Sequence, residues 1–320
     1  MSEGTPQHPA YLWWNGQQRA WEDAIVHVTD LGWSTVGAVF EGIRGYWNPD
    51  TEQLHVFRLA EHLRRLAMST KLVRLPLAYD EAALTGAITD LLTANESRED
   101  TYIRPLAYTG KTSGKRFAQI GSDAELLINT HPMPSHLGTG MTYTAKVSSW
   151  TRISDNVMPP RVKNLSNYRN GQLAGYEATL DGYDTAFLLN TRGQVAEAPG
   201  ACVMMIRDGK LFTPDSGASI LESITRDALM TMAREVLGME VVERGIDRTE
   251  LYMADEVFTC GTAAEITPVV DIDKYPIGAG EIGPVTAELD RVFQDVLRGR
   301  ESRYGQWRTT VDMPVLAPVS

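Results

Sequence analysis

A chain of 320 residues, of which 43% are hydrophobic and 22% charged, has a globular composition and enough length for about two domains. The formal net charge of −11 argues against the basic face that nucleic-acid binding requires, so we expect no nucleic-acid partner. The two cysteines, Cys202 and Cys260, are too few for a disulfide framework, and no Cys/His cluster indicates zinc, so we expect no metal site.

The first ten residues and the apolar runs bear on where the protein works. MSEGTPQHPA has neither the basic stretch nor the apolar stretch of a signal peptide. No apolar run approaches the roughly 20 residues that span a bilayer. Because low cysteine use also fits a reducing compartment, we expect a cytoplasmic protein without a membrane partner.

The first part of the chain predicts strands and helices in alternation. A short aromatic strand is expected over residues 10–16, and helical periodicity over residues 58–72 places Leu59, Leu63, Leu66 and Ala67 on one face. Further strands are expected over 39–47, 51–59, 101–110 and 124–132, and a helix over 80–95.

Residues 131–140, HPMPSHLGTG, combine proline and glycine without periodicity and form the candidate linker. We therefore expect a small N-terminal α/β domain over residues 1–130, an interdomain loop over 131–140, and a larger C-terminal domain over 141–320. The larger domain is expected to be rich in short strands, which makes the fold class α/β (α+β).

The second part of the chain predicts hairpins followed by two helices. Hairpins are expected over 185–193 and 203–214, the second with a turn at Asp208-Gly209. Helices are expected within the stretches 223–239 and 284–299. Gly238 and Gly299 are expected just after their ends, and Pro284 in the first turn of the second helix. The last twenty residues are expected to be weakly ordered or a docked tail.

Glycine and histidine patterns elsewhere do not indicate a site. GAGEIG, residues 278–283, matches GxGxxG, but DIDKYPI precedes it in place of a buried strand, so we expect a turn before a helix. His55 and His62 flank a strand-to-helix turn with no third ligand nearby, which favours structural roles. No GxSxG supports a serine hydrolase.

The segment RVKNLSNYRN, residues 161–170, raises the main question. Lys163 lies among asparagines, a serine and a tyrosine, with no carboxylate three or four residues away. It is either a surface lysine in a loop or a lysine that forms a Schiff base with an aldehyde. The second interpretation needs a carboxylate for a pyridine nitrogen, a hydrogen-bond donor for a phenolate, and an arginine with N–H groups for a phosphate. Candidates for these roles are Glu197, Tyr168, Arg65 and the turns at 224–226 and 261–264.

One of these turns, LESITRDA, opens a helix, and a helix N-terminus suits phosphate. An ordinary helix cap by Ser223 is the simpler interpretation of that turn taken alone.

These segments taken together resemble a known family. The chain resembles the fold type IV pyridoxal-phosphate aminotransferases, most closely the branched-chain amino-acid aminotransferases, and the matching segments occur in family order over roughly residues 11–290. They are LWWNGQQRAWEDAIVHV, VFEGIRGY, FRLAEHLRRL, YIRPL, VKNLSNY, VAEAPG, GKLFTP, ITRDA and ADEVFTCGTAAEITPV. The resemblance implies two α/β domains with the cofactor between them, and a homodimer.

The resemblance also implies roles for the cofactor residues. Lys163 would form the Schiff base and later carry a proton between the substrate carbon and the cofactor carbon. Glu197 would pair with the pyridine nitrogen, and Tyr168 would hydrogen-bond the phenolic oxygen. The phosphate would be held by Arg65, the N–H groups of Ile224 and Thr225, and Thr262.

Substrate residues follow from the same resemblance. The substrate α-carboxylate would meet Tyr102 and the N–H groups of Thr262 and Ala263. Phe40, Arg44 and Arg104 would shape the pocket.

The chain departs from the branched-chain pattern at the pocket. Thr35 and His136 stand where the family usually has tyrosines, and Cys202 stands where it often has an asparagine. The loop after YIRPL carries Lys111, Lys115 and Arg116, where the family tends to be apolar or neutral. These departures predict a pocket for a bulkier or more polar partner.

The function that the resemblance implies is transamination by ping-pong kinetics, from an L-amino acid to a 2-oxo acid such as 2-oxoglutarate. The donor is expected to be branched-chain-like or a bulkier or more polar variant. The alternatives are an amine transaminase, a D-amino-acid transaminase or a lyase of the same fold, and, more remotely, a non-catalytic protein that binds pyridoxal phosphate.

Overall fold

The computed structural model describes residues 8–28, 33–110 and 124–314. The chain forms two compact units, one from Met1–Ser135 with Val296–Ser320 and the other from His136–Asp295. The boundary falls inside the expected loop 131–140. At the C-terminus the division differs from the expected domain 141–320, because β17 (Arg308–Asp312) pairs antiparallel with β5 (Gln53–Phe57) of the first unit. Residues 308–312 thus form a strand docked on the N-terminal sheet.

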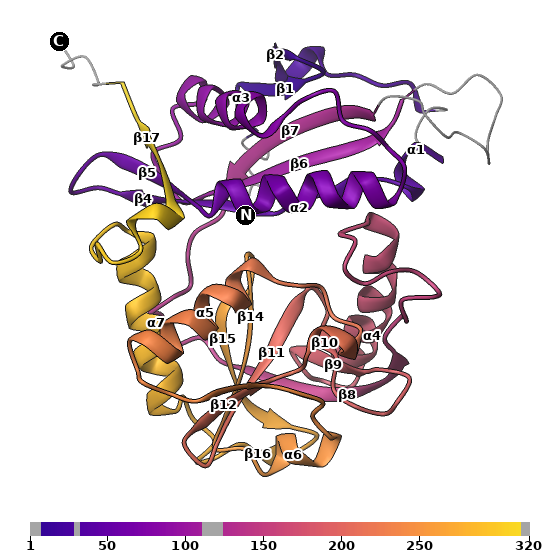
Figure 1. Cartoon of the computed structure of the whole chain (residues 1–320), viewed down its shortest axis with the longest axis vertical. Coiled ribbons are helices and arrows are strands. Elements are labelled where there is room, and N and C mark those ends of the chain that lie inside the picture. The colour runs from indigo at the N-terminus through magenta and orange to yellow at the C-terminus, as the bar shows by residue number, and fades with distance from the viewer. Residues whose placement is uncertain (1–7, 29–32, 111–123, 315–320) are drawn as a thin grey trace, which may run out of the picture. The chain divides into compact units, whose positions relative to one another are not determined.

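The first unit is built on an antiparallel sheet. Among the described residues this sheet has eight strands in the order β17-β5-β4-β6-β7-β1-β2, with β3 paired to β6. Helices α2 and α3 pack against each other and against β3 and β1 respectively (Figure 1). The remaining strands are β1 (Tyr11–Trp14), β2 (Gln17–Ala20), β3 (Val39–Phe40), β4 (Ile43–Asn48), β6 (Thr101–Thr109) and β7 (Ala124–Pro132), and the helical elements are η1 (Trp21–Asp23), α1 (Trp33–Val36), α2 (Leu59–Leu72), α3 (Glu81–Ala94) and η5 (Gly305–Trp307).

Helix α2 confirms the expected helix over 58–72 with one correction. Leu59, Leu63 and Leu66 are buried, but Ala67 is exposed, so its place on the buried face was wrong. His62 completes the buried stripe instead. The buried residues recur at three and four positions apart, which is the spacing of one helix face.

The strand expected over 39–47 is two strands, with a break at Glu41-Gly42 between β3 and β4. A Cβ on Gly42 would overlap the hydroxyl of Tyr102, so a side chain at this position would force the tyrosine to move. The break turns the Glu41 side chain into the interior, where it is fully buried. The register with β6 is the same on both sides of the break, since Phe40 pairs with Leu106 and Ile43 with Ile103, and the N–H of Glu41 donates to the Pro105 carbonyl at 2.9 Å.

The second unit is built on a mixed sheet. Among the described residues it has nine strands in the order β13-β12-β11-β14-β15-β8-β9, with β10 paired to β11 and β16 to β15. Strands β8 and β9 are parallel, and α4 connects them and packs on both (Figure 1). The strands are β8 (Tyr143–Thr151), β9 (Thr185–Leu189), β10 (Glu197–Ala198), β11 (Ala201–Arg207), β12 (Lys210–Thr213), β13 (Val241–Glu243), β14 (Glu256–Gly261), β15 (Glu265–Ile272) and β16 (Tyr275–Pro276).

The helical elements of this unit confirm both long helices expected from the sequence. They are η3 (Leu165–Asn167), α4 (Tyr168–Leu180), η4 (Ser216–Ala218), α5 (Ile224–Glu235), α6 (Arg248–Tyr252) and α7 (Pro284–Leu297). Helix α5 ends at Glu235, and Gly238 beyond it has a left-handed φ of +63°, in agreement with the expected glycine after the helix end. Helix α7 begins at Pro284 as expected, and the buried carboxylate of Glu256 accepts from the N–H groups of its first turn.

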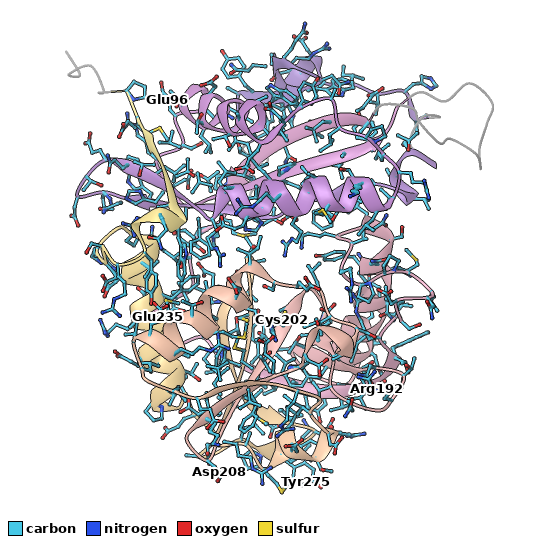
Figure 2. The ribbon with its side chains drawn as sticks, in the orientation of Figure 1. Glu96, Arg192, Cys202, Asp208, Glu235 and Tyr275 are labelled. Carbon is cyan, nitrogen blue, oxygen red and sulfur yellow. The ribbon has the colours of Figure 1, made fainter. Side chains whose placement is uncertain are left out.

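The β11–β12 hairpin has the turn that its sequence predicts. Asp208 and Gly209 both have positive φ, 50° and 72°, which is the type I′ geometry that Asp-Gly favours. Figure 2 shows Asp208 at the tip of this hairpin and Cys202 toward the other end of β11. The core behind this sheet is apolar and includes Phe187, Val203 and Met205.

Within the described residues, no helix is long and apolar enough to cross a membrane. Within the same residues, no group of three or more His, Cys, Asp or Glu side chains is arranged to hold a metal ion.

Candidate active site

Lys163 lies in the connection that leaves β8 and enters α4. In α/β structures the loops that follow strands are where ligands commonly bind, because they are free of sheet pairing. The polar residues around Lys163 fix this loop. Asn164 accepts from the N–H of Ser166 at 2.8 Å, and the buried Asn167 donates to the carbonyls of Pro159 and Val162 at 3.1 and 3.0 Å. The asparagine side chains therefore bond to backbone groups of the loop, which in a strand would bond to a neighbouring strand.

The amine of Lys163 meets the phenol of Tyr168, the first residue of α4. Nζ donates to the Tyr168 hydroxyl at 2.7 Å, and both side chains are partly buried. The structure therefore brings together two of the residues expected at the site. An amine and a phenol at hydrogen-bonding distance suit a ligand that carries an aldehyde next to a phenolic oxygen.

Glu197 in β10 supplies a buried carboxylate. Its Oε1 lies 2.7 Å from Nη2 of Arg152, and its Oε2 accepts from the N–H of Leu221 at 2.8 Å. Burial raises the pKa of the Glu197 carboxyl, while Arg152, the Leu221 N–H and the nearby Lys163 ammonium offset part of that rise. A buried carboxylate held on one side by a cation is suited to accept a hydrogen bond from a cationic ring nitrogen.

Sequence reasoning missed Arg152. It follows β8 directly, is buried, and also donates to the carbonyl of Asn167 at 3.4 Å and to Oδ1 of Asn170 at 3.3 Å. One guanidinium thus links the Glu197 carboxylate to the segment that holds Lys163. The signal that could have found it is an arginine at the carboxyl end of a strand just before the polar segment.

Cys202 lies beside Glu197 in the sheet. It pairs with Glu197 in β10 and with Cys260 in β14, and both cysteines are free and buried. Its Sγ donates to the carbonyl of Leu221 at 3.6 Å, so Leu221 is contacted on its two backbone groups by Cys202 and Glu197. Burial raises the pKa of the Cys260 thiol well above its usual value, which keeps it neutral.

The N-terminus of α5 follows Leu221 directly. Ser223 caps the helix by accepting from the N–H of Arg226 at 3.3 Å, which confirms the capping interpretation. Ile224 and Thr225 form the first turn, where N–H groups have no carbonyl of the same helix to bind. Capping does not exclude anion binding here, because the cap uses the N–H of Arg226 and not those of Ile224 and Thr225.

Thr262 and Ala263 lie in the turn between β14 and β15. The turn follows Gly261, where an added Cβ would lie 3.5 Å from the carbonyl of Gly200. A Cβ on Gly200 would in turn lie 3.5 Å from Cε1 of Tyr168. Both distances are ordinary van der Waals contacts, so the turn after β14 lies against Gly200, and Gly200 lies against the Tyr168 ring. Glycine is favoured at position 200 by its φ of +81°.

His136 contacts the same turn. Its Nδ1 lies 3.1 Å from Oε2 of Glu265, and its Nε2 lies 3.0 Å from the carbonyl of Ala264. The residue expected to form part of the substrate pocket thus has both ring nitrogens directed at the segment that follows Ala263.

Arg65 of the first unit is held by Glu41, a residue that sequence reasoning did not single out. Arg65 Nε and Nη2 donate to the two carboxylate oxygens of Glu41 at 2.7 and 2.8 Å, and Nδ1 of His62 lies 2.7 Å from Oε2. Burial acts to raise the pKa of Glu41, but Arg65 and His62 prevail and lower it to about 2. Glu41 is therefore ionised and fixes the arginine bidentately.

The structural roles expected of the two histidines are confirmed. His62 is 1% exposed in this cluster, and His55 contacts the Thr310 hydroxyl at 3.2 Å across the β5–β17 pairing.

The other candidates of the first unit occupy the sheet and its surroundings. Arg44 and Tyr102 are directly paired between β4 and β6, and Arg44 is buried with Nη2 donating to the Met133 carbonyl at 2.6 Å. Arg104 is exposed and donates to Asn129 at 3.2 Å. Phe40 is buried in β3, and Thr35 is exposed in α1. Lys111, Lys115 and Arg116 lie outside the described residues.

The residues of the second unit fit pyridoxal phosphate in their chemistry. An amine and a phenol in contact match the aldehyde and phenolic oxygen, a buried carboxylate matches the ring nitrogen, and a helix N-terminus matches the phosphate. Lys163, Tyr168, Glu197, Ile224 and Thr225 would hold these groups. Each donor set thus corresponds to one functional group of the cofactor.

Comparisons with known proteins agree with this fit. Residues 38–272 match the family model described as amino-transferase class IV. A probable branched-chain-amino-acid aminotransferase of Aquifex aeolicus is 42% identical over 91% of this chain and 93% of that protein, and the branched-chain-amino-acid aminotransferase of Escherichia coli K12 is 37% identical over 94% and 97%.

Solved structures give the same result. The branched-chain amino acid aminotransferase of Thermobaculum terrenum in its PLP-bound form superposes with a TM-score of 0.93 at 50% identity, over 96% of this chain and 99% of that one. The chain therefore belongs to the class IV aminotransferases, has the fold of type IV enzymes, and uses pyridoxal phosphate as its cofactor.

Proposed function

We propose that the protein moves the amino group of an L-amino acid to a 2-oxo acid, with a branched-chain-like or a bulkier, more polar amino acid as donor and 2-oxoglutarate as acceptor. The observation that carries the proposal is the contact between Lys163 Nζ and Tyr168 Oη at 2.7 Å, close to the buried Glu197–Arg152 pair. The branched-chain aminotransferase relatives support the choice of donor class.

Bound pyridoxal phosphate supplies an electron-withdrawing ring that stabilises negative charge at the substrate α-carbon. Glu197 would accept a hydrogen bond from the ring nitrogen, and Arg152 acts to lower the pKa of this carboxyl against the rise that burial causes. Lys163 Nζ would anchor the cofactor through its aldehyde, and the same amine would hold and move the substrate α-proton. Tyr168 orients Nζ through its hydroxyl, and the N–H groups of Ile224 and Thr225 hold the phosphate.

Recognition of the substrate carboxylate distinguishes an amino acid from a simple amine. We propose that the N–H groups of Thr262 and Ala263 receive this carboxylate, with Tyr102 as a further donor. Arg65, oriented by Glu41, adds a cation for the phosphate. The Thr262 hydroxyl adds a hydrogen bond to it. Thr35, Phe40, Arg44 and Arg104 shape the side-chain pocket, in which Thr35 leaves more room than a tyrosine.

A panel of single donors tests the proposal. The purified holoenzyme is mixed with L-valine, L-leucine, L-isoleucine, L-methionine, L-phenylalanine, D-leucine and isopentylamine, and loss of the visible cofactor band is followed in stopped flow. We expect L-amino acids to react at least about 100-fold faster than the amine, because the amine has no carboxylate to bind at the turn at Thr262.

Two outcomes would change the assignment. A preference for the amine would favour an amine transaminase, and a preference for D-leucine would favour the D-amino-acid branch. Among the L-amino acids, a wide margin in kcat/KM for valine, leucine and isoleucine would contradict the enlarged, more polar pocket but leave the reaction type intact.

We further propose a cytoplasmic homodimer. The free, buried thiols of Cys202 and Cys260 fit a reducing compartment, and the family resemblance supports the dimer. Exposed apolar side chains on α4, Tyr176 and Leu180, offer surface for such an association. Light scattering after size-exclusion chromatography tests it, since a monomer mass would exclude the dimer.

A further inference from the structure

The turn at Thr262–Ala264 is hydrogen-bonded by His136, a residue of the loop that precedes β8. Nε2 of His136 lies 3.0 Å from the Ala264 carbonyl and 3.1 Å from the Thr267 hydroxyl, which itself donates to the Ala264 carbonyl at 2.7 Å. On the other side, Oε2 of Glu265 accepts from the backbone N–H of His136 at 2.9 Å and lies 3.1 Å from its Nδ1. Four short contacts therefore join one histidine to the end of the turn.

The hydrogen-bond direction on the Nε2 side is settled by its partners. A carbonyl oxygen only accepts, so Nε2 donates to Ala264. The Thr267 hydroxyl gives its proton to the same carbonyl and can accept from Nε2. Both ring nitrogens of His136 are thus directed at the turn and the first residues of β15.

Glu265 shows that the turn is held in an unfavourable backbone conformation. Its φ is +44°, in the left-handed region that residues with a side chain seldom adopt, and its side chain is fully buried. Such a conformation persists where the surroundings fix it. The carboxylate that His136 contacts belongs to this strained residue, so the contact also fixes the backbone at the point where the turn enters β15.

We propose that His136 is a positioning residue for substrate binding. By holding the Ala264 carbonyl and Glu265, it fixes the orientation of the Thr262 and Ala263 N–H groups that receive the substrate α-carboxylate. This inference rests on the proposed function. It differs from the expected role of His136 as a wall of the side-chain pocket, because it assigns to His136 an effect on the carboxylate common to all amino-acid substrates.

A positioning role of His136 affects binding of the substrate carboxylate but not binding of the cofactor. The phosphate donors Ile224 and Thr225 and the amine of Lys163 lie on other segments, none of which His136 contacts in the described structure. Loss of the His136 ring should therefore weaken substrate binding while leaving cofactor affinity and the wavelength of the cofactor band unchanged.

The test compares His136→Ala, His136→Gln and Thr139→Ala as holoenzymes. Thr139 is the matched control, because its hydroxyl donates to the His136 carbonyl at 2.6 Å within the same loop, and the side chain is exposed and contacts no residue of the turn among the hydrogen bonds described. Gln retains a side-chain N–H donor in place of Nε2. For each protein, kcat and KM are measured for several L-amino acids and for 2-oxoglutarate, and the dissociation constant of pyridoxal phosphate is measured by equilibrium dialysis.

We expect His136→Ala to raise KM about tenfold for every amino acid and for the 2-oxo acid, because the Ala264 carbonyl and Glu265 lose the ring that holds them. The value of kcat should change less than about threefold. His136→Gln should recover part of the loss. Thr139→Ala should match the wild type. The dissociation constant of pyridoxal phosphate should stay within about twofold in all three variants.

Three results would overturn the proposal. These are unchanged KM values in His136→Ala, a KM change confined to donors of one side-chain size, or a parallel loss of cofactor affinity. If His136→Ala does not fold, the same comparison is made with His136→Gln and Glu265→Gln, and wild-type KM values in both would overturn it. Failure of the proposed function is distinguished by the wild type itself, which would then show no transamination of L-amino acids.

Discussion

The buried pair of Arg152 and Glu197 allows a quantitative prediction. Replacing Arg152 with Met keeps much of the volume and removes the cation. The side chains are 7% and 8% exposed, and Nη2 lies 2.7 Å from Oε1. With charge centres about 4 Å apart and an effective dielectric constant of about 20, their attraction is about 4 kcal/mol.

Arg152→Met therefore leaves a buried carboxylate with the Leu221 N–H as its main remaining donor. The pKa of Glu197, already raised by burial, should rise further, and the variant should lose about 3–5 kcal/mol of stability. Glu197→Gln should lose a comparable amount, because it leaves the guanidinium without its carboxylate. The double variant should lose clearly less than the sum, with a coupling energy of about 2–4 kcal/mol.

The assay is urea unfolding of the four cofactor-free proteins at one protein concentration, so that ligand binding and association do not enter the comparison. A coupling energy below about 0.5 kcal/mol would refute the reasoning. It would show that water screens the pair as it screens a surface ion pair.

Other changes to the site have equally definite results. Lys163→Ala and the charge-preserving control Lys163→Arg should both abolish steady-state transamination while leaving the far-ultraviolet circular dichroism unchanged; turnover in either would exclude Lys163 as the proton carrier. Glu197→Gln should still bind pyridoxal phosphate but lower kcat by about 100-fold, and a near-normal kcat would mean that another group protonates the ring. The pKa of Glu41 is lowered from 4.5 to about 2, so its contribution to stability, about 3 kcal/mol, is present above pH 4.5 and is lost as the pH falls toward 2. Glu41→Gln should flatten acid unfolding curves in that window, and an unchanged pH dependence would contradict the ionised Glu41–Arg65 pair.

The parts of the fold that follow from local sequence were predictable. Helices α2, α3, α5 and α7 have the apolar spacing and end residues of helices, and Asp208-Gly209 specifies its own turn. These signals act within a few residues, so no knowledge of distant partners is needed.

The docking of β17 on β5 could not be predicted in the same way. Nothing in Arg308–Asp312 identifies β5 as its partner, since strand pairing depends on which edge of a sheet remains available after the rest of the chain has folded. The break at Glu41-Gly42 is similar, because Tyr102, whose side chain lies close to Gly42, comes from another strand.

The candidate site shows the same division. The family resemblance predicted Lys163, Tyr168 and Glu197 as site residues, and the structure places these three residues in one unit. Arg152 and Glu41 escaped notice because each acts through a buried ion pair with a residue far away in the chain. Ion-pair partners have no spacing rule in sequence, whereas caps and turns do.

The central claim is that Lys163 holds pyridoxal phosphate. Reduction of the holoenzyme with borohydride, followed by proteolysis and mass spectrometry, tests it most directly, because reduction makes the link between lysine and cofactor permanent. The account predicts a single modified peptide that contains Lys163, and none when an amino-acid donor has first converted the enzyme to its amine form. A modification on another lysine, or no modification of the pigmented protein, would contradict it.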